Sequence, residues 1–382
     1  MRFGFGKRFV LVLALTLAFA AAASAASSTG RSKAIRSGTD GEIAFINDFP
    51  RPCPQPAAPA AECGDSQIFT IKPDGTDLQQ MTYGPPKMGA FSLAPNGQSL
   101  LYTVPLKGKG NPAKCGRSPT QTTCSRVCPC RNAMVEAADD GSQVTVISPP
   151  CPGRCLGDDN PTYSPDGKRI AFERAFGRSS TSSHASVVAI FTMNADGSHL
   201  TRLTEKKTPT STEDHEPQWS PNGKKIAFVR LNTTATPRHA EAIEVMNADG
   251  SHIRRLTPFW LDAADPRWSP NGKQLLFNDH GHGSGESNSG QNANLFTINV
   301  NGSHLTQLTH FHHHNHRSTS AYAQAWSPDG TQILYLRVTH RPGGGFCGAC
   351  NATSGPLTII NTHGKQIRQL PAQDSGSAAW IK

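Results

Sequence analysis

The sequence has 382 residues, with 35 glycines, 29 prolines and a formal net charge of +9 from 37 basic and 28 acidic side chains. The basic residues are scattered rather than gathered in runs, which argues against a nucleic-acid-binding protein, and no nucleic-acid partner is expected. The basic excess is better explained by solubility or by weak attraction to acidic cell-surface polymers.

The N-terminus has the pattern of a secretory signal peptide. Three basic residues precede an apolar run from Phe9 to about Ala23, and Ala23-Ser24-Ala25 offers small residues at the cleavage positions. A membrane anchor is the alternative, but the run is shorter than the roughly 20 residues of a span. We therefore expect residues 1–25 to be removed, leaving a chain without a transmembrane span that is secreted, periplasmic or associated with the cell envelope.

One tight-turn motif recurs along the rest of the chain: a proline, then Asp or Asn, then glycine. Proline fixes φ at the first central position of such a turn, Asp or Asn suits the second, and glycine accepts the left-handed conformation that follows. A degenerate copy, Thr39-Asp40-Gly41, comes first. The full copies are Ala94-Pro95-Asn96-Gly97, Ser164-Pro165-Asp166-Gly167, Ser220-Pro221-Asn222-Gly223, Ser269-Pro270-Asn271-Gly272 and Ser327-Pro328-Asp329-Gly330.

Each copy leads into a short run of the apolar and aromatic residues that favour strands. An aromatic residue also stands before each full copy, and we expect its ring to pack between neighbouring repeats. The runs are Ile43-Ala44-Phe45, Leu100-Leu101-Tyr102, Ile170-Ala171-Phe172, Ile226-Ala227-Phe228, Leu275-Leu276-Phe277 and Ile333-Leu334-Tyr335, and the aromatic residues are Phe91, Tyr163, Trp219, Trp268 and Trp326.

A second turn motif alternates with the first. The strand-like Ile190-Phe191-Thr192-Met193 precedes Ala195-Asp196-Gly197, and another short strand from Leu200 to Thr204 follows. Further copies of this turn are Pro73-Asp74-Gly75, Ala248-Asp249-Gly250, Asn301-Gly302 and His363-Gly364, with a weaker one ending at Gly141.

Each repeat thus supplies four short strands and two tight turns, with 49 to 70 residues between successive glycines of the first motif. No repeat holds a long segment of helical period, so helical repeats are excluded, and four strands at this spacing predict a propeller blade. The six copies predict an all-β, six-bladed β-propeller over residues 39–382, after a short linker at 26–38. The strand from Ser377 to Lys382 lacks its own turn and should complete the first blade, which would close the ring.

The two motifs together resemble the TolB-like propeller repeat, in the form Trp-Ser-Pro-Asp/Asn-Gly-x-x-Ile-Ala-Phe and Met-Asn-Ala-Asp-Gly-Ser-x-x-x-x-Leu-Thr. The resemblance covers roughly residues 39 to 382 and implies the propeller fold. TolB proteins also carry an α/β domain before the propeller, whereas only about a dozen residues separate the signal from the first repeat here. The resemblance therefore does not imply the envelope role of TolB itself.

The longest connections should all lie on one face of the ring, opposite the tight turns, and we expect this loop face to be the working face. Its cysteines are even in number, which in an exported chain favours disulfides. Cys53 with Cys63 is the first expected pair and Cys347 with Cys350 the second. A zinc site at the C-x-x-C of Cys347 and Cys350 is the alternative, but no second pair of ligands stands at zinc-site spacing from it. The candidates are Cys53, Cys63, Cys115, Cys124, Cys128, Cys130, Cys151, Cys155, Cys347 and Cys350.

Polar residues stand just before the innermost strands and are expected to ring the channel mouth at the loop face. Their oxygen atoms would suit a hard cation such as Ca²⁺ or a cationic group of a ligand. The alternative is that they are solvated strand ends or bond to neighbouring blades. These candidate ligand-binding residues are Asp159, Asn160, His215, Glu216, Asp265 and Gln324.

A histidine-rich segment is the most unusual local feature. Imidazole suits zinc, copper or nickel, and His280 and His282 could approach from another loop of the same blade. A flexible loop that binds metal only adventitiously is the alternative, and no cofactor is required by the sequence. The candidate metal ligands are His310, His312, His313, His314 and His316.

Two functions remain open. The first is a monomeric binding or scaffolding module that contacts a protein or a cell-envelope glycan through the loop face. The second is a metal-dependent enzyme acting on polysaccharide as a lyase or hydrolase, because propeller lyases of pectin fragments use histidines and a metal on a comparable scaffold. The sequence contains no Gly-x-Ser-x-Gly elbow and no complete catalytic constellation, which favours the binding module.

Overall fold

The computed structural model describes residues 41–50, 64–82, 90–106, 131–138, 143–150, 155–177, 186–204, 212–232, 240–280, 292–312, 318–340, 352–373 and 377–381. All of them belong to one compact unit, Lys33–Lys382. The predictions of a signal peptide and a linker concern residues outside these ranges. Among the described residues, no helix is long and apolar enough to cross a membrane.

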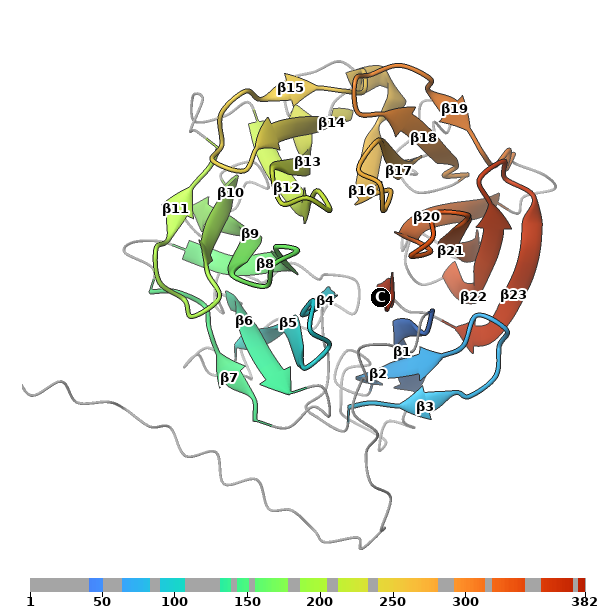
Figure 1. Ribbon diagram of the computed structural model, residues 1–382, viewed down its shortest axis with the longest axis horizontal. Coiled ribbons are helices and arrows are strands. Elements are labelled where there is room, and N and C mark those ends of the chain that lie inside the picture. The colour runs from blue at the N-terminus through green and yellow to red at the C-terminus, as the bar shows by residue number, and fades with distance from the viewer. Residues whose placement is uncertain are drawn as a thin grey trace, which may run out of the picture. The chain divides into compact units, whose positions relative to one another are not determined.

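Six four-stranded antiparallel sheets surround a central axis (Figure 1), which confirms the predicted six-bladed propeller. From the axis outward, blade one is β24 (Ala378–Trp380), β1 (Ile43–Pro50), β2 (Gly64–Ile71) and β3 (Gln79–Gln80), and blade two is β4 (Phe91–Leu93), β5 (Ser99–Leu106), β6 (Arg131–Ala138) and β7 (Thr145–Val146). Blade three is β8 (Cys155–Tyr163), β9 (Arg169–Gly177), β10 (Ser186–Asn194) and β11 (Thr201–Arg202), and blade four is β12 (Thr212–Trp219), β13 (Lys225–Asn232), β14 (Ala240–Asn247) and β15 (Arg254–Arg255). Blade five is β16 (Ala263–Trp268), β17 (Gln274–Asp279), β18 (Leu295–Asn299) and β19 (Thr306–Gln307), after the short 3-10 helix η3 (Phe259–Leu261), and blade six is β20 (Ser318–Trp326), β21 (Gln332–His340), β22 (Ala352–Asn361) and β23 (Gln366–Gln373).

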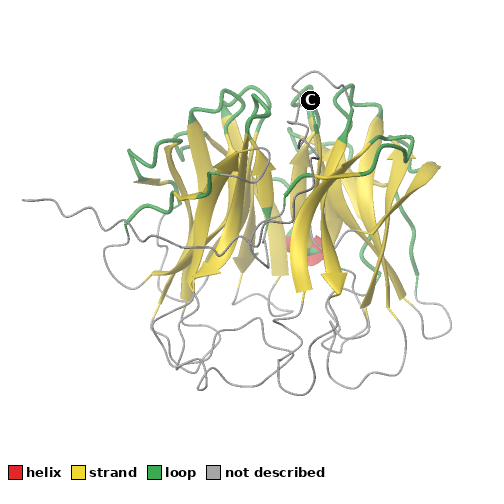
Figure 2. Ribbon diagram, turned by 90° about the horizontal axis from the view of Figure 1, so that it is seen from below, coloured by secondary structure: helices red, strands yellow, loops and turns green. Residues whose placement is uncertain are grey.

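The two turn motifs gather at one end of the ring, which we call the turn end (Figure 2, top). In the first turn of blade three, the N–H of Gly167 donates to the carbonyl of Ser164 at 2.8 Å, and the Ser164 hydroxyl donates to Asp166 Oδ1 at 2.6 Å. Gly167 has φ +69°, in the left-handed region that the motif was expected to need. The opposite end of the ring is the loop end.

The aromatic residue before each first turn bridges neighbouring blades, as predicted. The indole N–H of Trp268 in blade five donates to the carbonyl of Gln218 in blade four at 3.0 Å. Trp326 in blade six repeats this contact with the carbonyl of Arg267 at 3.2 Å. Blades five and six share this bond, whereas the indole nitrogen of Trp219 in blade four has no hydrogen-bond partner among the described residues and its ring packs with Ala171 and Ile190 of blade three.

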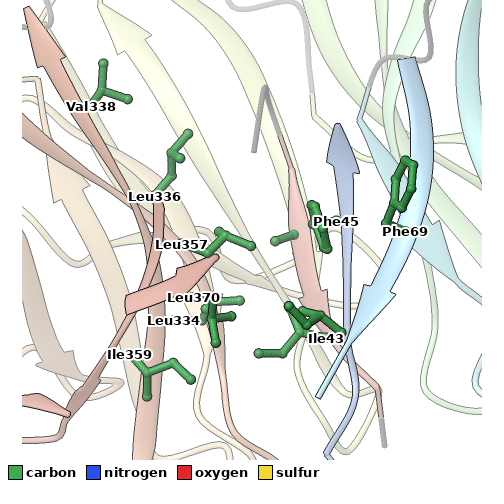
Figure 3. Packing of buried hydrophobic residues seen from close by; sticks show 11 residues of the cluster. Ile43, Phe45, Phe69, Leu334, Leu336, Val338, Leu357, Ile359 and Leu370 are labelled. Atoms are coloured by element: carbon green, nitrogen blue, oxygen red, sulfur yellow. The ribbon is translucent and has the colours of Figure 1, made fainter. Parts of the chain in front are cut away.

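The hydrophobic core is divided among the blade-to-blade interfaces. Figure 3 shows the interface of blades six and one, where Phe45 and Phe69 face Leu334 and Leu357. Side chains on alternate positions of a strand point to opposite faces, so every middle strand contributes to two such clusters. Ala44 and Ile46 accordingly belong to the cluster shared with blade two.

The ring closes through β24, which pairs antiparallel with β1 in the register Ile43 to Trp380. The N–H of Ile381 donates to the carbonyl of Glu42 at 2.7 Å, and the Trp380 indole donates to the carbonyl of Gly41 at 2.9 Å. The predicted completion of the first blade by the C-terminal strand is confirmed, and the inner edge of β1 is thereby covered.

Candidate functional site

The inner strands of blades three, four and five share a local irregularity. Their pairing with the second strand shifts register at residues 159–162, 215–218 and 264–267. Each shift contains a residue with positive φ followed by proline: Asn160 at 47°, Glu216 at 52° and Asp265 at 54°. Proline cannot donate to a β-ladder and fits at such a bulge. Positive φ costs a non-glycine residue about 1–3 kcal/mol and is concentrated at functional sites.

The bulges are linked from blade to blade by side-chain hydrogen bonds. The N–H of Glu216 in blade four donates to Glu173 Oε2 in blade three at 2.9 Å. The N–H of Asp265 in blade five then donates to Glu216 Oε2 at 2.8 Å. In blade six, Gln324 Oε1 accepts the N–H of Ala378 in β24 at 2.8 Å. The first two bonds satisfy amides that the bulges leave unpaired, and the third ties blade six to β24.

Asp159 lies against blade two rather than in the channel. Its Oδ1 accepts the Thr103 hydroxyl at 3.0 Å, and its Oδ2 accepts the side-chain N–H of Asn132 at 2.8 Å. Burial and the negative charge of Glu173 raise the pKa of the Asp159 carboxyl above its ordinary value. This residue joins two blades.

His215 lies between two glutamates. Its Nδ1 is 3.5 Å from Glu173 Oε2 and its Nε2 is 3.5 Å from Glu213 Oε2. Burial alone would lower the pKa of His215, but the hydrogen bonds and charges of both glutamates raise it to about 11. The charged imidazolium in turn holds the pKa of the buried Glu173 below its ordinary value. The positive charge of His215 therefore stabilises the negative charges of Glu173 and Glu213 on either side of it.

Glu216 and Asp265 bring two carboxyl groups to the central channel at the level of the bulges. Burial, followed by the negative charges of Asp265 and Glu241, raises the pKa of Glu216 to about 8. Arg267 lies beside them: its Nη2 is 3.6 Å from Asp265 Oδ1, while its Nε donates to the carbonyl of Gln324 at 2.9 Å. Glu216 therefore holds its proton at neutral pH, because ionisation would place a second negative charge beside Asp265.

Two further acidic side chains, Glu241 and Asp262, lie next to these carboxyl groups on the side of the loop end. His280 Nε2 is 2.8 Å from Glu241 Oε2, and Asp262 Oδ1 accepts the N–H of Glu241 at 2.9 Å. Burial alone would lower the pKa of His280, but Glu241, and then Asp262 and Asp265, raise it to about 9. His280 therefore pairs with blade four, and no contact joins it to His310 in the part of the chain that the structure describes.

A cavity of about 550 Å³ occupies the channel from the bulges to the prolines of the first turns. Its floor includes Asn160, Glu216, Asp265, Arg267 and Gln324. Its wall is made of the inner strands of all six blades, and the aromatic and proline side chains on it are Phe91, Tyr163, Trp219, Trp268, Trp326, Trp380, Pro95, Pro165, Pro221, Pro270 and Pro328. The site thus has a polar floor and a wall on which the edges of largely buried aromatic rings and the prolines lie, and its surface is about equally polar and apolar.

Four of the predicted channel residues, Asn160, Glu216, Asp265 and Gln324, line this one cavity, whereas Asp159 and His215 turn to neighbouring blades. The sequence placed all six just before the innermost strands at the loop face. They lie inside those strands instead, because the bulges let the strands continue past the prolines toward the loop end.

Sequence reasoning missed Glu173, although the repeats carried a signal for it. The residue after the apolar triplet is Thr103 in blade two, Glu173 in blade three and Asn278 in blade five. Each of these polar side chains bonds to the bulge region of the next blade, and Asn278 Oδ1 accepts the N–H of Ala323 at 2.9 Å. The same position is apolar in the other three blades (Ile46, Val229 and Leu336), so alignment of the repeats marks the three polar residues as exceptions without naming their partners.

The histidine and cysteine candidates lie mostly outside the described residues. His310 and His312 are exposed on either side of the half-buried Phe311, while His313, His314 and His316 are outside the described ranges. Within those ranges, no group of three His, Cys, Asp or Glu side chains could hold a metal ion. Cys155 is buried at the start of β8. The other nine cysteines are outside, so their pairing, like metal binding by the histidines, stays a prediction.

No protein-family model matches the chain, and no curated protein matches it. Among solved structures, TolB from Acinetobacter baumannii has a TM-score of 0.55 at 18% identity, over 89% of this chain and 66% of its own length. A putative TolB from Agrobacterium tumefaciens has a TM-score of 0.51 at 14% identity, over 86% and 87%. A chain of a nidogen–laminin complex has a TM-score of 0.51 at 10% identity, over 90% and 99%.

At these identities the likeness shows the fold alone, which is that of a TolB-like propeller. The chain spans less than two thirds of the length of the Acinetobacter protein.

Proposed function

We propose that this protein is an exported binding module whose ligand, a protein or a glycan, inserts a cationic group between Glu216 and Asp265 at the floor of the channel cavity. The observation that supports this most directly is that burial and the charges of Asp265 and Glu241 raise the pKa of Glu216, with Arg267 paired to Asp265 alone among the described carboxyl groups. An added cation between the two carboxyl groups would favour the ionised form of Glu216, so binding should release a proton at neutral pH.

The shape of the cavity supports binding by insertion. The aromatic and proline wall can enclose an apolar stem, while the floor offers the carboxyl groups together with the side-chain amides of Asn160 and Gln324. A lysine or arginine side chain has this combination of apolar body and cationic tip, and an amino sugar supplies the cation on a more polar ring. The cavity extends from these carboxyl groups toward the turn end, so in this proposal the ligand enters from that end and not through the loop face expected from the sequence.

Calorimetry with matched ligands tests the site. Pentalysine and the glucosamine tetramer should bind, whereas the uncharged N-acetylglucosamine tetramer should bind at least tenfold more weakly. The variant Glu216→Gln/Asp265→Asn should lose the cationic ligands, because it removes both carboxyl groups while keeping the acceptor for the Asp265 N–H. Glu42→Gln/Asp77→Asn removes two charges away from the cavity and serves as the control.

Two results would contradict the proposal. The first is equal affinity for the glucosamine and N-acetylglucosamine tetramers. The second is an equal loss of binding in the two variants, which would indicate attraction to overall charge.

A further inference from the structure

The turns of blades three, four and five carry an excess of cationic side chains. These residues are scattered in the sequence, so they do not form a basic run there. Counted over the first turn with the two residues that follow it, and over the second turn with the outer strand, these blades hold eight Lys and Arg side chains against three Asp among the described residues. The corresponding described residues of blades six, one and two hold three cations against four carboxylates. We call the eight cations the basic arc: Lys168, Arg169, Arg202, Lys224, Lys225, Arg254, Arg255 and Lys273.

The arc is continuous because successive first turns touch. A methyl group on Gly223 would lie 3.7 Å from Cδ of Pro165, and one on Gly272 would lie 3.7 Å from Cδ of Pro221. The lysine after each glycine therefore recurs once per blade along one rim of the turn end, from β8 round to β19 in Figure 1.

The backbone holds these lysines in equivalent positions. The carbonyl of Lys168 accepts the N–H of Ala195 at 2.9 Å, which ties the first turn of blade three to its second turn. Lys224 and Lys273 make the same 2.9 Å bond with Ala248 and Val300. All three lysines are exposed, and none pairs with a carboxylate within the described ranges.

A histidine adjoins each lysine on the second turn. His199 Nδ1 lies 2.9 Å from the side-chain nitrogen of Asn194, and His252 and His304 repeat this at 3.0 Å with their own asparagines. An amide nitrogen can only donate, so Nδ1 is the acceptor and the neutral ring carries its proton on Nε2. Each exposed ring thus adds an N–H donor beside a lysine.

The three carboxylates that lie among these cations accept hydrogen bonds from backbone N–H groups of their own turns. Asp166 Oδ1 accepts the N–H of Lys168 at 3.1 Å, and Asp196 and Asp249 accept the N–H groups of Ser198 and Ser251, each at 2.9 Å. Side-chain and backbone hydrogen bonds from these turns lower the pKa of all three carboxyls. They cap the turns. Lys168, Lys224 and Lys273 are exposed, whereas Arg169 stacks over the Trp219 ring, Lys225 donates to Asn247 Oδ1, and Arg254 donates to the carbonyls of Val300 and Asn301.

From this geometry we infer that the turn end of blades three to five binds a linear acidic polysaccharide, with its carboxylate or sulfate groups on the basic arc. Cations at three equal steps, each with an N–H donor, match a chain of repeated anions and hydroxyls better than one compact anion. The arc lies outside the channel cavity, so this inference does not rest on the cationic ligand proposed above.

Size-defined heparin oligosaccharides provide the test, with the purified protein and calorimetry or surface plasmon resonance. Affinity should rise with oligosaccharide length until the arc is spanned, and should fall steeply from 50 to 300 mM NaCl because exposed charges are screened. The variant Lys168→Gln/Lys224→Gln/Lys273→Gln should bind about tenfold more weakly, since each exposed ion pair contributes up to a few-fold.

The matched control is Lys72→Gln/Lys365→Gln/Arg368→Gln, which removes three charges from the same end of the ring in blades six and one. It should bind nearly as the unaltered protein does, and thermal melting should show both variants folded. Equal weakening of the two variants would overturn the inference, because net charge alone would then explain binding. Binding only to vesicles containing anionic phospholipid, and not to the oligosaccharides, would overturn it in favour of a membrane.

Discussion

Three side chains near the channel hold a proton more tightly in the folded chain than in the unfolded one. The pKa of Glu216 is raised to about 8, that of His280 to about 9 and that of His215 to about 11. Burial dominates for Glu216, whereas neighbouring carboxylates outweigh burial for the two histidines. A group of this kind stabilises the fold fully below its unfolded pKa and loses that contribution as the pH rises to its folded pKa.

The melting temperature should therefore fall as the pH rises from about 6.5 to about 9.5. Over this range Glu216 loses the rest of its contribution near pH 8 and His280 loses its contribution near pH 9, while the loss from His215 continues toward its folded pKa of about 11. In Glu216→Gln the fall should be smaller below pH 8, because the variant no longer has a proton to lose there. Differential scanning calorimetry at constant ionic strength measures this, with Glu42→Gln as the control. A flat profile in the unaltered protein, or parallel profiles in the two variants, would show that these groups are not coupled to folding.

At the scale of the element, the second turns differ in how closely they approach the preceding blade. Gly250 and Gly302 have φ of +88° and +89°. A Cβ on Gly250 would lie 2.8 Å from the carbonyl oxygen of Leu203, whereas the nearest atom to one on Gly302 is Arg254 Nη1 at 3.8 Å. The two positions therefore separate backbone strain from steric conflict between blades.

Gly302→Ala should cost about 1–2 kcal/mol of unfolding free energy, the price of a left-handed alanine. Gly250→Ala should cost at least about 1 kcal/mol more, because Leu203 has to move. Urea unfolding of both variants provides the comparison. Equal losses would mean that the blades separate at this turn without resistance.

The turns and strand runs of each blade were predictable because they depend on local chemistry, as the Pro-Asn/Asp-Gly motifs show. The bulges were not, since the dipeptides Asn160-Pro161, Glu216-Pro217 and Asp265-Pro266 also suit the start of a strand. Their location within β8, β12 and β16 depends on hydrogen bonds to the preceding blade. One example is the bond that the Glu216 N–H donates to the Glu173 carboxylate. Contacts of this kind join residues more than 40 positions apart, which no local pattern reports.

At the scale of the whole molecule, stability depends on the contacts of one short strand. Ile381, which is 4% exposed, packs in the cluster of blades one and two, while Ile367 on β23 is 50% exposed. Ile381→Ala should cost about 2–5 kcal/mol, whereas Ile367→Ala should change stability by less than about 0.5 kcal/mol. Removal of Ser377 to Lys382 should destabilise the whole domain further, because it uncovers the edge of β1.

Chemical denaturation of the two point variants and the truncated protein measures these effects. A truncated protein that melts within a degree or two of the unaltered one would contradict the role of β24 in closing the ring.

The pairing of β24 with β1 also constrains how the chain is made. The Trp380 indole bonds to a residue 339 positions earlier, so β1 has no inner partner until almost the whole propeller has been synthesised. Blades two to six can form from contiguous sequence, but blade one must wait with an open edge that could pair with another chain. The last step of folding is thus the capture of a three-residue strand by loop closure over the entire domain, a slow and non-local event. Nascent or stalled chains that lack this strand are the species most exposed to aggregation.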